Sequence, residues 1–304
     1  RATLRRHQTL RAALEWSHGF LEEAERTVFR RLAVFAGSGS LAMVQQVVAD
    51  PDGQGGLDEW AVLDALALVA ATYAENRTGL QWRGIQDTTN DPIVVGRAPR
   101  AYLNYQMSED YYRGGQMIWL EADALIRAGS NGKRSLDDFA RAFFGVNDGE
   151  WKVQDLYTFE DVVATLNGVH PHDWSTFLRD RLDGRTGLTG GIEAGGWKLV
   201  YKDEPNAYAK GSGSRGGADF TYSIGLTIGK DGSIGDVRWD GPAFNAGIGS
   251  GTQVIAVNGT AYDGDVLEEA IKAAKTGKAP IELLVKEFDR YRTVKIDYHG
   301  GLRH

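Results

Sequence analysis

The sequence predicts a modular α+β chain, because helical periodicity and strand-like alternation occupy different parts of it. Apolar residues recur at helical spacing up to about residue 185. After about residue 195, short runs rich in β-branched and aromatic residues alternate with Gly and Asp turns. We therefore expect a helical segment over 1–70, a second helical block over 71–185 and a β domain over 195–304.

The bulk composition is that of an ordinary globular protein and narrows the possible partners. Hydrophobic residues make up 42% and charged residues 25% of the 304 residues. The net charge of −7 does not indicate nucleic acid or a membrane surface as a partner. The longest apolar run, 65–71, is far shorter than the roughly 20 residues of a membrane-spanning helix. The chain has no cysteine, which excludes disulfides and thiolate metal ligands.

The first part of the chain has the periodicity of four short helices. They are expected over 10–17, 28–36, 40–48 and 57–71. Gly37 and Gly39 would end the second helix, and Ser40 would cap the third. The stretch 50–56 is rich in Gly, Pro and Asp and predicts a loop.

The second block centres on a helix that begins in the run S-E-D-Y-Y-R-G-G-Q at 108–116. The apolar residues behind this run predict a helix over 108–127. The preceding stretches, 72–76 and 79–93, are expected to be loops, and 79–93 contains the turn-forming triplet N-D-P. Gly114 and Gly115 each cost a helix about 1 kcal/mol relative to alanine. They therefore indicate close backbone packing or approach to a ligand.

Two capping boxes predict where the next helices start. Ser135 and Asp138 have the spacing at which a hydroxyl and a carboxylate satisfy each other's backbone N–H groups. Thr158 and Asp161 repeat that spacing before a second apolar run. A further short helix is expected over 174–178.

The β domain is expected to contain six strands and one helix. The strands are predicted at 197–201, 220–228, 233–238, 253–257, 281–285 and 291–298. The helix is predicted over 266–274, between the fourth and fifth of these strands.

The amino-terminal segment carries a first family resemblance. The strings are R-H-Q-T-L-R-A-A-L-E-W-S from Arg6 and F-R-R-L-A-V-F-A-G from Phe29. Over about 4–69 they resemble the winged-helix-like region behind the nucleotide-binding module of bacterial signalling ATPases. The phosphate-binding motif G-x-x-x-x-G-K-[ST] of those ATPases has no counterpart here, so no nucleotide chemistry is implied.

The β domain resembles a PDZ domain. Three strings carry this resemblance: S-I-G-L-T-I-G at 223–229, G-P-A-F-N-A-G-I at 241–248 and V-I-A-V-N-G at 254–259. A PDZ domain captures peptide or protein C-termini by adding a strand to a sheet edge, with loop N–H groups holding the carboxylate. The resemblance places Gly225, Leu226, Thr227 and Ile228 in the loop and edge, and Val266, Leu267 and Ala270 along the groove. The alternative is that neighbouring parts of the same chain fill the groove.

The helical block together with the β domain resembles the M61 family of zinc aminopeptidases. The carrying strings are Q-D-T-T-N-D-P-I from Gln86, S-E-D-Y-Y-R-G-G-Q from Ser108, K-R-S-L-D-D-F-A-R-A-F-F-G from Lys133 and D-Y-H-G-G-L-R from Asp297. The match runs over about 79–303, and it meets the first resemblance near residue 70. It implies peptide-bond hydrolysis at the amino terminus of a substrate, by a zinc-bound water with a glutamate as general base.

The M61 resemblance assigns a catalytic role to Tyr112, three residues before Gly115. The phenol would hydrogen-bond the oxyanion as it forms. Tyr111 is the competing assignment. The two side chains point about 100° apart on a helix, so only one of them can face such a site.

Zinc is implied by the family but is not expected to be bound by this chain. The H-E-x-x-H motif of the family has no counterpart, and neither has the third zinc ligand. His170 and His172 form an H-x-H pair, but a catalytic zinc needs three protein ligands and an open position. We therefore expect that the chain alone does not hydrolyse peptides.

Three functional hypotheses follow. The first is an M61-type peptidase part that is inactive by itself, and the second is a PDZ-type peptide-binding module. The third is a fragment of a signalling-ATPase regulator. Self-association is also expected, because apolar surface would be exposed where a catalytic half would pack.

Overall fold

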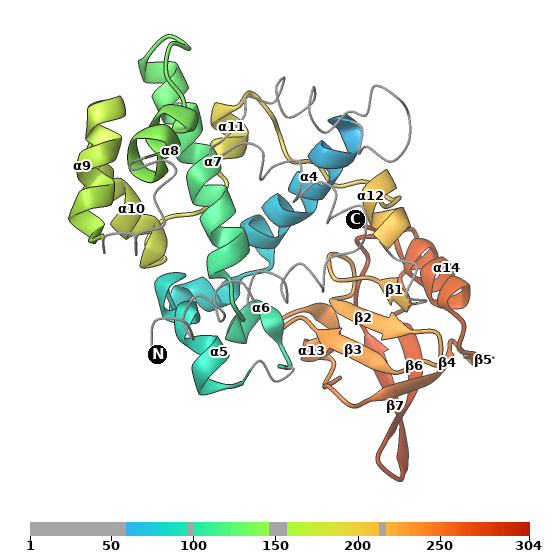
Figure 1. The fold of residues 1–304 in the computed structure, drawn as a ribbon. Helices are drawn as coiled ribbons and strands as arrows, with labels where there is room; N and C mark the ends of the chain where they lie inside the picture. The colour runs from blue at the N-terminus through green and yellow to red at the C-terminus, as the bar shows by residue number, and fades with distance from the viewer. Residues whose placement is uncertain (1–58, 97–99, 146–156, 213–216) are drawn as a thin grey trace. The chain divides into compact units, whose positions relative to one another are not determined.

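The computed structural model describes residues 59–96, 100–145, 157–212 and 217–304 (Figure 1). Helices predominate up to residue 212 and strands from residue 217, so the predicted α+β class is confirmed. The helices predicted over 10–17, 28–36 and 40–48, and the loop over 50–56, lie outside the described residues. The fourth predicted helix is confirmed as α4, Glu59–Glu75. The loop predicted over 72–76 is wrong, because α4 continues through Glu75 and the Thr72 hydroxyl donates to the Leu68 carbonyl one turn earlier, at 2.9 Å.

The chain divides into two compact units. Residues 1–63 and 122–175 form the first, and residues 64–121 and 176–304 form the second. Helices α7, Tyr111–Gly129, and α10, Trp174–Leu182, contribute residues to both. The domain boundaries expected near residues 70 and 185–195 stay a prediction. No helix in the described part of the chain is long and apolar enough to cross a membrane.

In the first unit, both predicted capping boxes are present. Helix α8, Leu136–Phe144, begins after Ser135, whose N–H donates to the Asp138 carboxylate at 2.9 Å. Helix α9, Phe159–Val169, begins after Thr158, whose hydroxyl accepts the N–H of Asp161 at 3.2 Å. Each cap satisfies backbone N–H groups that the first helical turn leaves without a partner.

In the second unit, the loop predicted over 79–93 is wrong, because short helical turns occupy it. They are η1, Thr78–Gln81; η2, Gln86–Asn90; and α5, Asp91–Val94. The hydroxyls of Thr88 and Thr89 each donate to the carbonyl three residues earlier, at 2.6 and 2.7 Å. The same polar residues that suggested a turn therefore stabilise tight helical turns.

Helix α7 confirms the predicted tyrosine helix but starts at Tyr111 instead of Ser108. Glu109 has a φ of 48°, which no right-handed helix contains. The N–H of Ser108 donates to the side chain of Asp110 at 2.8 Å, a local bond that competes with helix formation. The remaining short helices of this unit are α6, Leu103–Gln106; α11, Gly190–Ala194; and α12, Ala207–Ser212.

The described strands form two antiparallel sheets, with strand orders β1-β2-β3 and β5-β4-β6-β7 (Figure 1). The first sheet contains β1, Gly217–Asp219; β2, Leu226–Gly229; and β3, Ile234–Val237. The second contains β4, Gln253–Val257; β5, Thr260–Ala261; β6, Ile281–Glu287; and β7, Arg290–Ile296. Two helices accompany them, α13, Pro242–Asn245, and α14, Gly264–Ala274.

Two strand predictions need correction. Residues 197–201 form no strand, and Tyr201 instead places its ring 3.8 Å from the guanidinium carbon of Arg303. Of the strand predicted over 220–228, only 226–228 is extended, because 220–225 is a turn that leads into β2. The predictions for β3, β4, β6, β7 and α14 are confirmed within a few residues.

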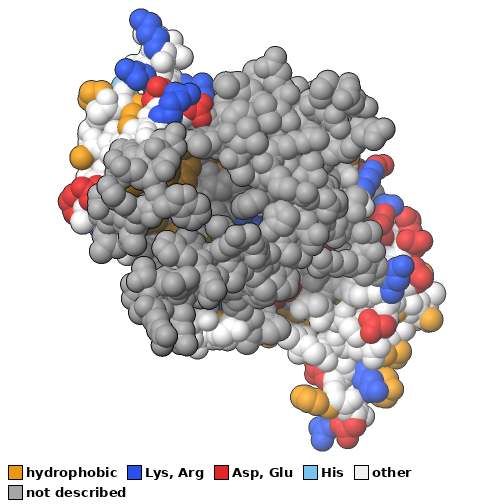
Figure 2. Space-filling model, in the orientation of Figure 1, with side chains coloured by type: hydrophobic (Ala, Val, Ile, Leu, Met, Phe, Trp, Pro, Cys, Tyr) orange, Lys and Arg blue, Asp and Glu red, His pale blue; other side chains and the backbone are white. Residues whose placement is uncertain are grey.

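The core of the β domain is apolar and draws on both sheets and α14. Alternate residues of β6, namely Ile281, Leu283 and Val285, are buried, as expected for a strand with one inward face. Leu267 and Ile271 on α14 pack into the same core at helical spacing. On the face drawn in Figure 2, acidic and basic side chains are interspersed over the β domain.

Candidate functional site

The loop before α7 holds three non-glycine residues in the left-handed region. Tyr102, Met107 and Glu109 have φ values of 57°, 58° and 48°. Bulky residues adopt this region only where surrounding contacts enforce it, and such strain concentrates at functional sites. Met107 is fully buried, and a Cβ added at Gly79 would lie 2.7 Å from its Cγ. Close packing therefore fixes this loop in its strained shape.

A first buried carboxylate, Asp110, fixes the start of α7. It accepts the Tyr73 hydroxyl at 2.9 Å, the Arg77 Nε at 2.6 Å and the N–H of Ser108 at 2.8 Å. Burial, and then the nearby charge of Asp110, raises the pKa of Tyr73, so this phenol stays protonated and donates. Asp110 thus joins α4, the segment after it and the loop before α7.

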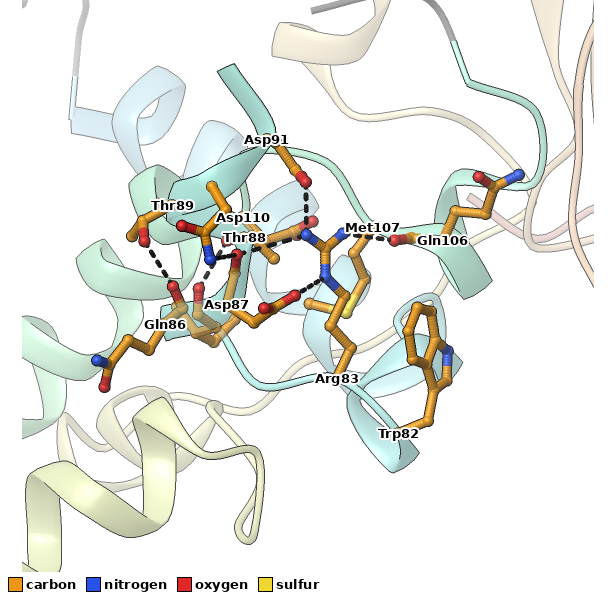
Figure 3. Close-up of polar contacts among 12 residues, drawn as sticks. Trp82, Arg83, Gln86, Asp87, Thr88, Thr89, Asp91, Gln106, Met107 and Asp110 are labelled. Carbon is orange, nitrogen blue, oxygen red and sulfur yellow. Dashed lines mark hydrogen bonds and ion pairs between the residues drawn. The ribbon is translucent and has the colours of Figure 1, made fainter. Parts of the chain in front are cut away.

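A second buried carboxylate, Asp91, holds the same loop from α5. It accepts Arg83 Nη2 at 2.5 Å, Arg100 Nη2 at 2.9 Å and the N–H of Glu109 at 3.1 Å. Figure 3 shows the Arg83 guanidinium between Asp91, Asp87 and a backbone carbonyl. Burial alone would raise the pKa of Asp91, but the hydrogen bonds and charges of its partners outweigh burial and lower it.

Sequence reasoning missed both carboxylates as site-forming residues. Asp91 and Asp110 stand in the quoted strings Q-D-T-T-N-D-P-I and S-E-D-Y-Y-R-G-G-Q, each next to the first residue of a helix or at it. Their position is a usable signal. Their partner Arg77 lies 33 residues from Asp110, and no local pattern reveals such a pair. We call Asp91, Asp110 and the arginines that contact them the carboxylate platform.

The two tyrosines at the start of α7 have different surroundings. Tyr112 is 57% exposed. Tyr111 is half-buried, its hydroxyl donates to Glu109 at 3.1 Å, and its N–H donates to the Thr88 hydroxyl at 3.1 Å. Burial, and then its hydrogen bond with Tyr112, raises the pKa of Tyr111. Of the two, Tyr112 is the more exposed, and its catalytic assignment stays a prediction.

The two glycines of α7 serve different purposes. A Cβ added at Gly114 would lie 2.7 Å from Ile85 Cδ1 and 3.3 Å from the Tyr73 hydroxyl. Gly114 therefore lets the helix pack closely against its neighbours, which is the first of the two roles expected for this pair of glycines. A Cβ at Gly115 would meet nothing within 4 Å, so close packing does not explain that glycine.

The two histidines of the H-x-H pair contact different neighbours. The His170 ring lies against α7, where a Cβ added at Gly129 would be 2.2 Å from Nε2. The His172 ring meets the Trp174 ring edge-on at 4.9 Å. Within the described residues, no group of three or more His, Cys, Asp or Glu could hold a metal ion. We assign no zinc-dependent step to these residues.

The residues predicted for a peptide groove lie in or against the core of the β domain. Gly225 has a φ of 82°, and Leu226 and Ile228 are buried. Thr227 accepts the N–H of Asp236 on β3 at 2.9 Å. On α14, Leu267 and Ala270 are buried, and Val266 packs against the core from outside. The structure thus places the residues of the loop and of β2 around the same core as those of α14. Strand β1 is paired to the edge of β2.

The β domain is fastened to the helices of the second unit by polar contacts. Asn104 binds the backbone of Trp239 in both directions, donating at 3.1 Å and accepting at 2.8 Å. Glu75 accepts both terminal guanidinium nitrogens of Arg303. Tyr102 packs its ring edge-on against Trp239, with 5.5 Å between ring centroids. These contacts give α4, α6 and the β domain a defined mutual position.

Comparison with solved structures gives a likeness in fold. An aminopeptidase N family protein from Idiomarina loihiensis matches with a TM-score of 0.60 and 17% sequence identity. The match covers 90% of this chain and 44% of that chain, so this chain spans less than half of it. At this identity the likeness shows the fold alone.

Comparison of sequences finds a likeness confined to one part of the chain. Proteins described as HTH-type transcriptional regulators, from Mycobacterium bovis and from two strains of Mycobacterium tuberculosis, are each 48% identical over 69 residues. The match covers 23% of this chain and 7% of those regulators. No family model matches the chain.

Proposed function

We propose that this chain forms the rear of the catalytic domain and the PDZ-like domain of an M61-type aminopeptidase, and that it does not hydrolyse peptides by itself. One observation carries the proposal: an exposed tyrosine stands on the first turn of α7, and the buried carboxylate platform holds the start of that helix. The peptidase-like fold over 90% of the chain supports it.

In this proposal Tyr112 binds the carbonyl oxygen of a peptide. Its phenolic O–H donates, and the oxygen accepts. The platform keeps the helix start from moving, which matters because a donor must be held in place before charge develops on the oxygen. Tyr111, tied to Glu109, orients the loop and does not meet the peptide.

The role of Tyr112 is tested by NMR on the full chain with ring-labelled tyrosine. A tripeptide with a free amino terminus is added in steps up to about 10 mM, a range that detects dissociation constants near 1 mM. We expect one tyrosine signal to shift saturably, and this signal to be missing in Tyr112→Phe. Tyr111→Phe is the matched control and should keep the shift. A shift that persists in Tyr112→Phe, or no shift at all, would contradict the proposal.

The second half of the proposal is tested by an activity assay. The purified chain is incubated with amino-acid p-nitroanilides, with and without added zinc. We expect the amino-terminal residue to be released no faster than from the same substrate in buffer without the chain. Zinc-dependent release that copurifies with the chain would overturn this half.

The other two hypotheses remain proposals with less support. A PDZ-type peptide-binding module needs an edge of β2 that is free to pair, and both edges of β2 are paired within the chain. The regulator hypothesis has the 48% identity in its favour, and it concerns 23% of the chain.

A further inference from the structure

Both edges of strand β2 are hydrogen-bonded within the β domain. Strand β3 pairs with one edge, and β1 pairs antiparallel with the other. The register on the β1 side joins Gly217 to Gly229, Ala218 to Ile228 and Asp219 to Thr227. This is the arrangement that a peptide adopts when it adds a strand to a sheet edge.

The residue after β1 continues this pairing toward the loop. The N–H of Phe220 donates to the carbonyl of Leu226 at 2.9 Å. The carbonyl oxygen of Phe220 accepts the N–H of Ser223 at 3.0 Å and that of Gly225 at 2.9 Å. Gly225 reaches a φ of 82° in this turn, which a residue with a side chain rarely adopts.

The side chain of Phe220 occupies the interior that a peptide side chain would otherwise enter. It is 2% exposed and belongs to the same apolar core as Leu226, Leu267 and Ile271. Ala218, two residues earlier on the same side of the strand, packs against this core. Phe220 therefore presents an inward apolar side chain and an oxygen held by two loop amides.

We propose that Gly217–Phe220 is a built-in ligand of the β domain, which closes this domain to free carboxyl-terminal peptides for as long as the segment stays in place. The segment uses the strand edge, the loop amides and the apolar interior together. A free peptide ending in phenylalanine would offer a carboxylate in place of the neutral carbonyl, and charge-assisted hydrogen bonds are stronger. It must nevertheless compete with a tethered segment at an effective concentration of roughly millimolar.

The close fit at the start of β1 offers a second way to release the segment. A Cβ added at Gly217 would lie 2.7 Å from the carbonyl oxygen of Ile228. Gly217→Val therefore forces the strands apart at this point while leaving Phe220 unchanged. Phe220→Ala instead removes the side chain that holds the segment in the apolar core, so that a peptide displaces the segment more easily.

The test measures binding of a fluorescent hexapeptide that ends in Gly-Ala-Asp-Phe with a free carboxylate, by fluorescence anisotropy on the full chain. We expect wild type to show no saturable binding below about 1 mM, because the tethered segment competes. Phe220→Ala should bind at least about tenfold more tightly than wild type, and the amidated peptide more weakly, because it lacks the charge. Phe288→Ala is the control, since Phe288 is 97% exposed at the β6–β7 turn and should behave as wild type.

Two results would overturn the proposal. One is binding of the hexapeptide to wild type as tight as binding to Phe220→Ala. The other is a folded Phe220→Ala protein, judged by circular dichroism, that gains no binding. If Phe220→Ala does not fold, Gly217→Val must show the gain. Rapid hydrogen exchange of the Phe220 amide in wild type would also contradict it, because this N–H donates to Leu226.

Discussion

The start of α7 and the edge of β2 are the two places where a peptide was expected to bind, and they are built in opposite ways. At α7, the Tyr112 side chain is exposed, while the carboxylates of the platform that hold the start of this helix are buried and paired with arginines. At β2, the backbone groups of the edge are already paired with β1, and Phe220 fills the interior. A strand edge that a motif marks for peptide binding can thus already be paired within the chain, while the Tyr112 side chain remains exposed.

The forces behind the two places differ as well. The carboxylate platform depends on charges taken out of water, which are stable only while each keeps its partner. The β2 edge depends on backbone hydrogen bonds and apolar burial. A change of pH should therefore act on the platform far more than on the edge.

The largest expected effect is at Asp91. Asp91→Ala would leave Arg83 and Arg100 without their shared buried carboxylate. Removing one partner of a buried ion pair typically destabilises a protein by about 3–5 kcal/mol. Urea unfolding followed by circular dichroism measures the loss.

The control for Asp91 is Lys295→Ala, which breaks an exposed pair with Glu282 at 3.7 Å on the β domain. Exposed pairs contribute about 0–1 kcal/mol. Equal losses in Asp91→Ala and Lys295→Ala would show that the platform does not depend on buried charge.

The next effect in size concerns the two adjacent glycines of α7. Gly114→Val would drive its side chain into Ile85, and overpacking typically costs about 1–3 kcal/mol. Gly115→Ala meets open space and should stabilise the helix by about 0.5–1 kcal/mol. Thermal unfolding of the two variants measures both changes in stability. If Gly115→Ala destabilised as much as Gly114→Val, the different roles of the two glycines would be wrong.

The smallest effect is on pH dependence. The pKa of Asp91 is lowered in the folded chain, so its stabilising contribution is fully present above the ordinary aspartate pKa of about 3.9. It is lost as pH falls through the folded pKa. The difference in urea midpoint between wild type and Asp91→Asn should therefore be constant near neutrality and shrink below about pH 4. A constant difference down to pH 2 would contradict the lowered pKa.

The sequence predicted those features whose cause is local. The capping boxes at Ser135 and Thr158 and the strand Gln253–Val257 each follow from a few neighbouring residues, and all three are confirmed. The stretch 79–93 was misjudged because Thr and Asn stabilise both open turns and tight helical turns.

What the sequence could not predict depends on partners distant in the chain. Strand β1 has the composition Gly-Ala-Asp, which disfavours strands, and it becomes a strand by pairing with β2. The platform joins Arg77 to Asp110 and Arg100 to Asp91, pairs that no periodicity indicates. Tyr111 likewise donates its N–H to the hydroxyl of Thr88, which lies 23 residues earlier in the chain.

The difference between an open α7 start and a closed β2 edge can be tested in one experiment, an amide NMR titration of the wild-type chain. The ligand is one pentapeptide that has both ends free. We predict that signals of residues at the start of α7, around Tyr112, shift, and that signals of Gly225, Thr227 and Ile228 stay in place. Shifts confined to Gly225–Ile228, with none near Tyr112, would contradict it, because the β2 edge would then be the open site.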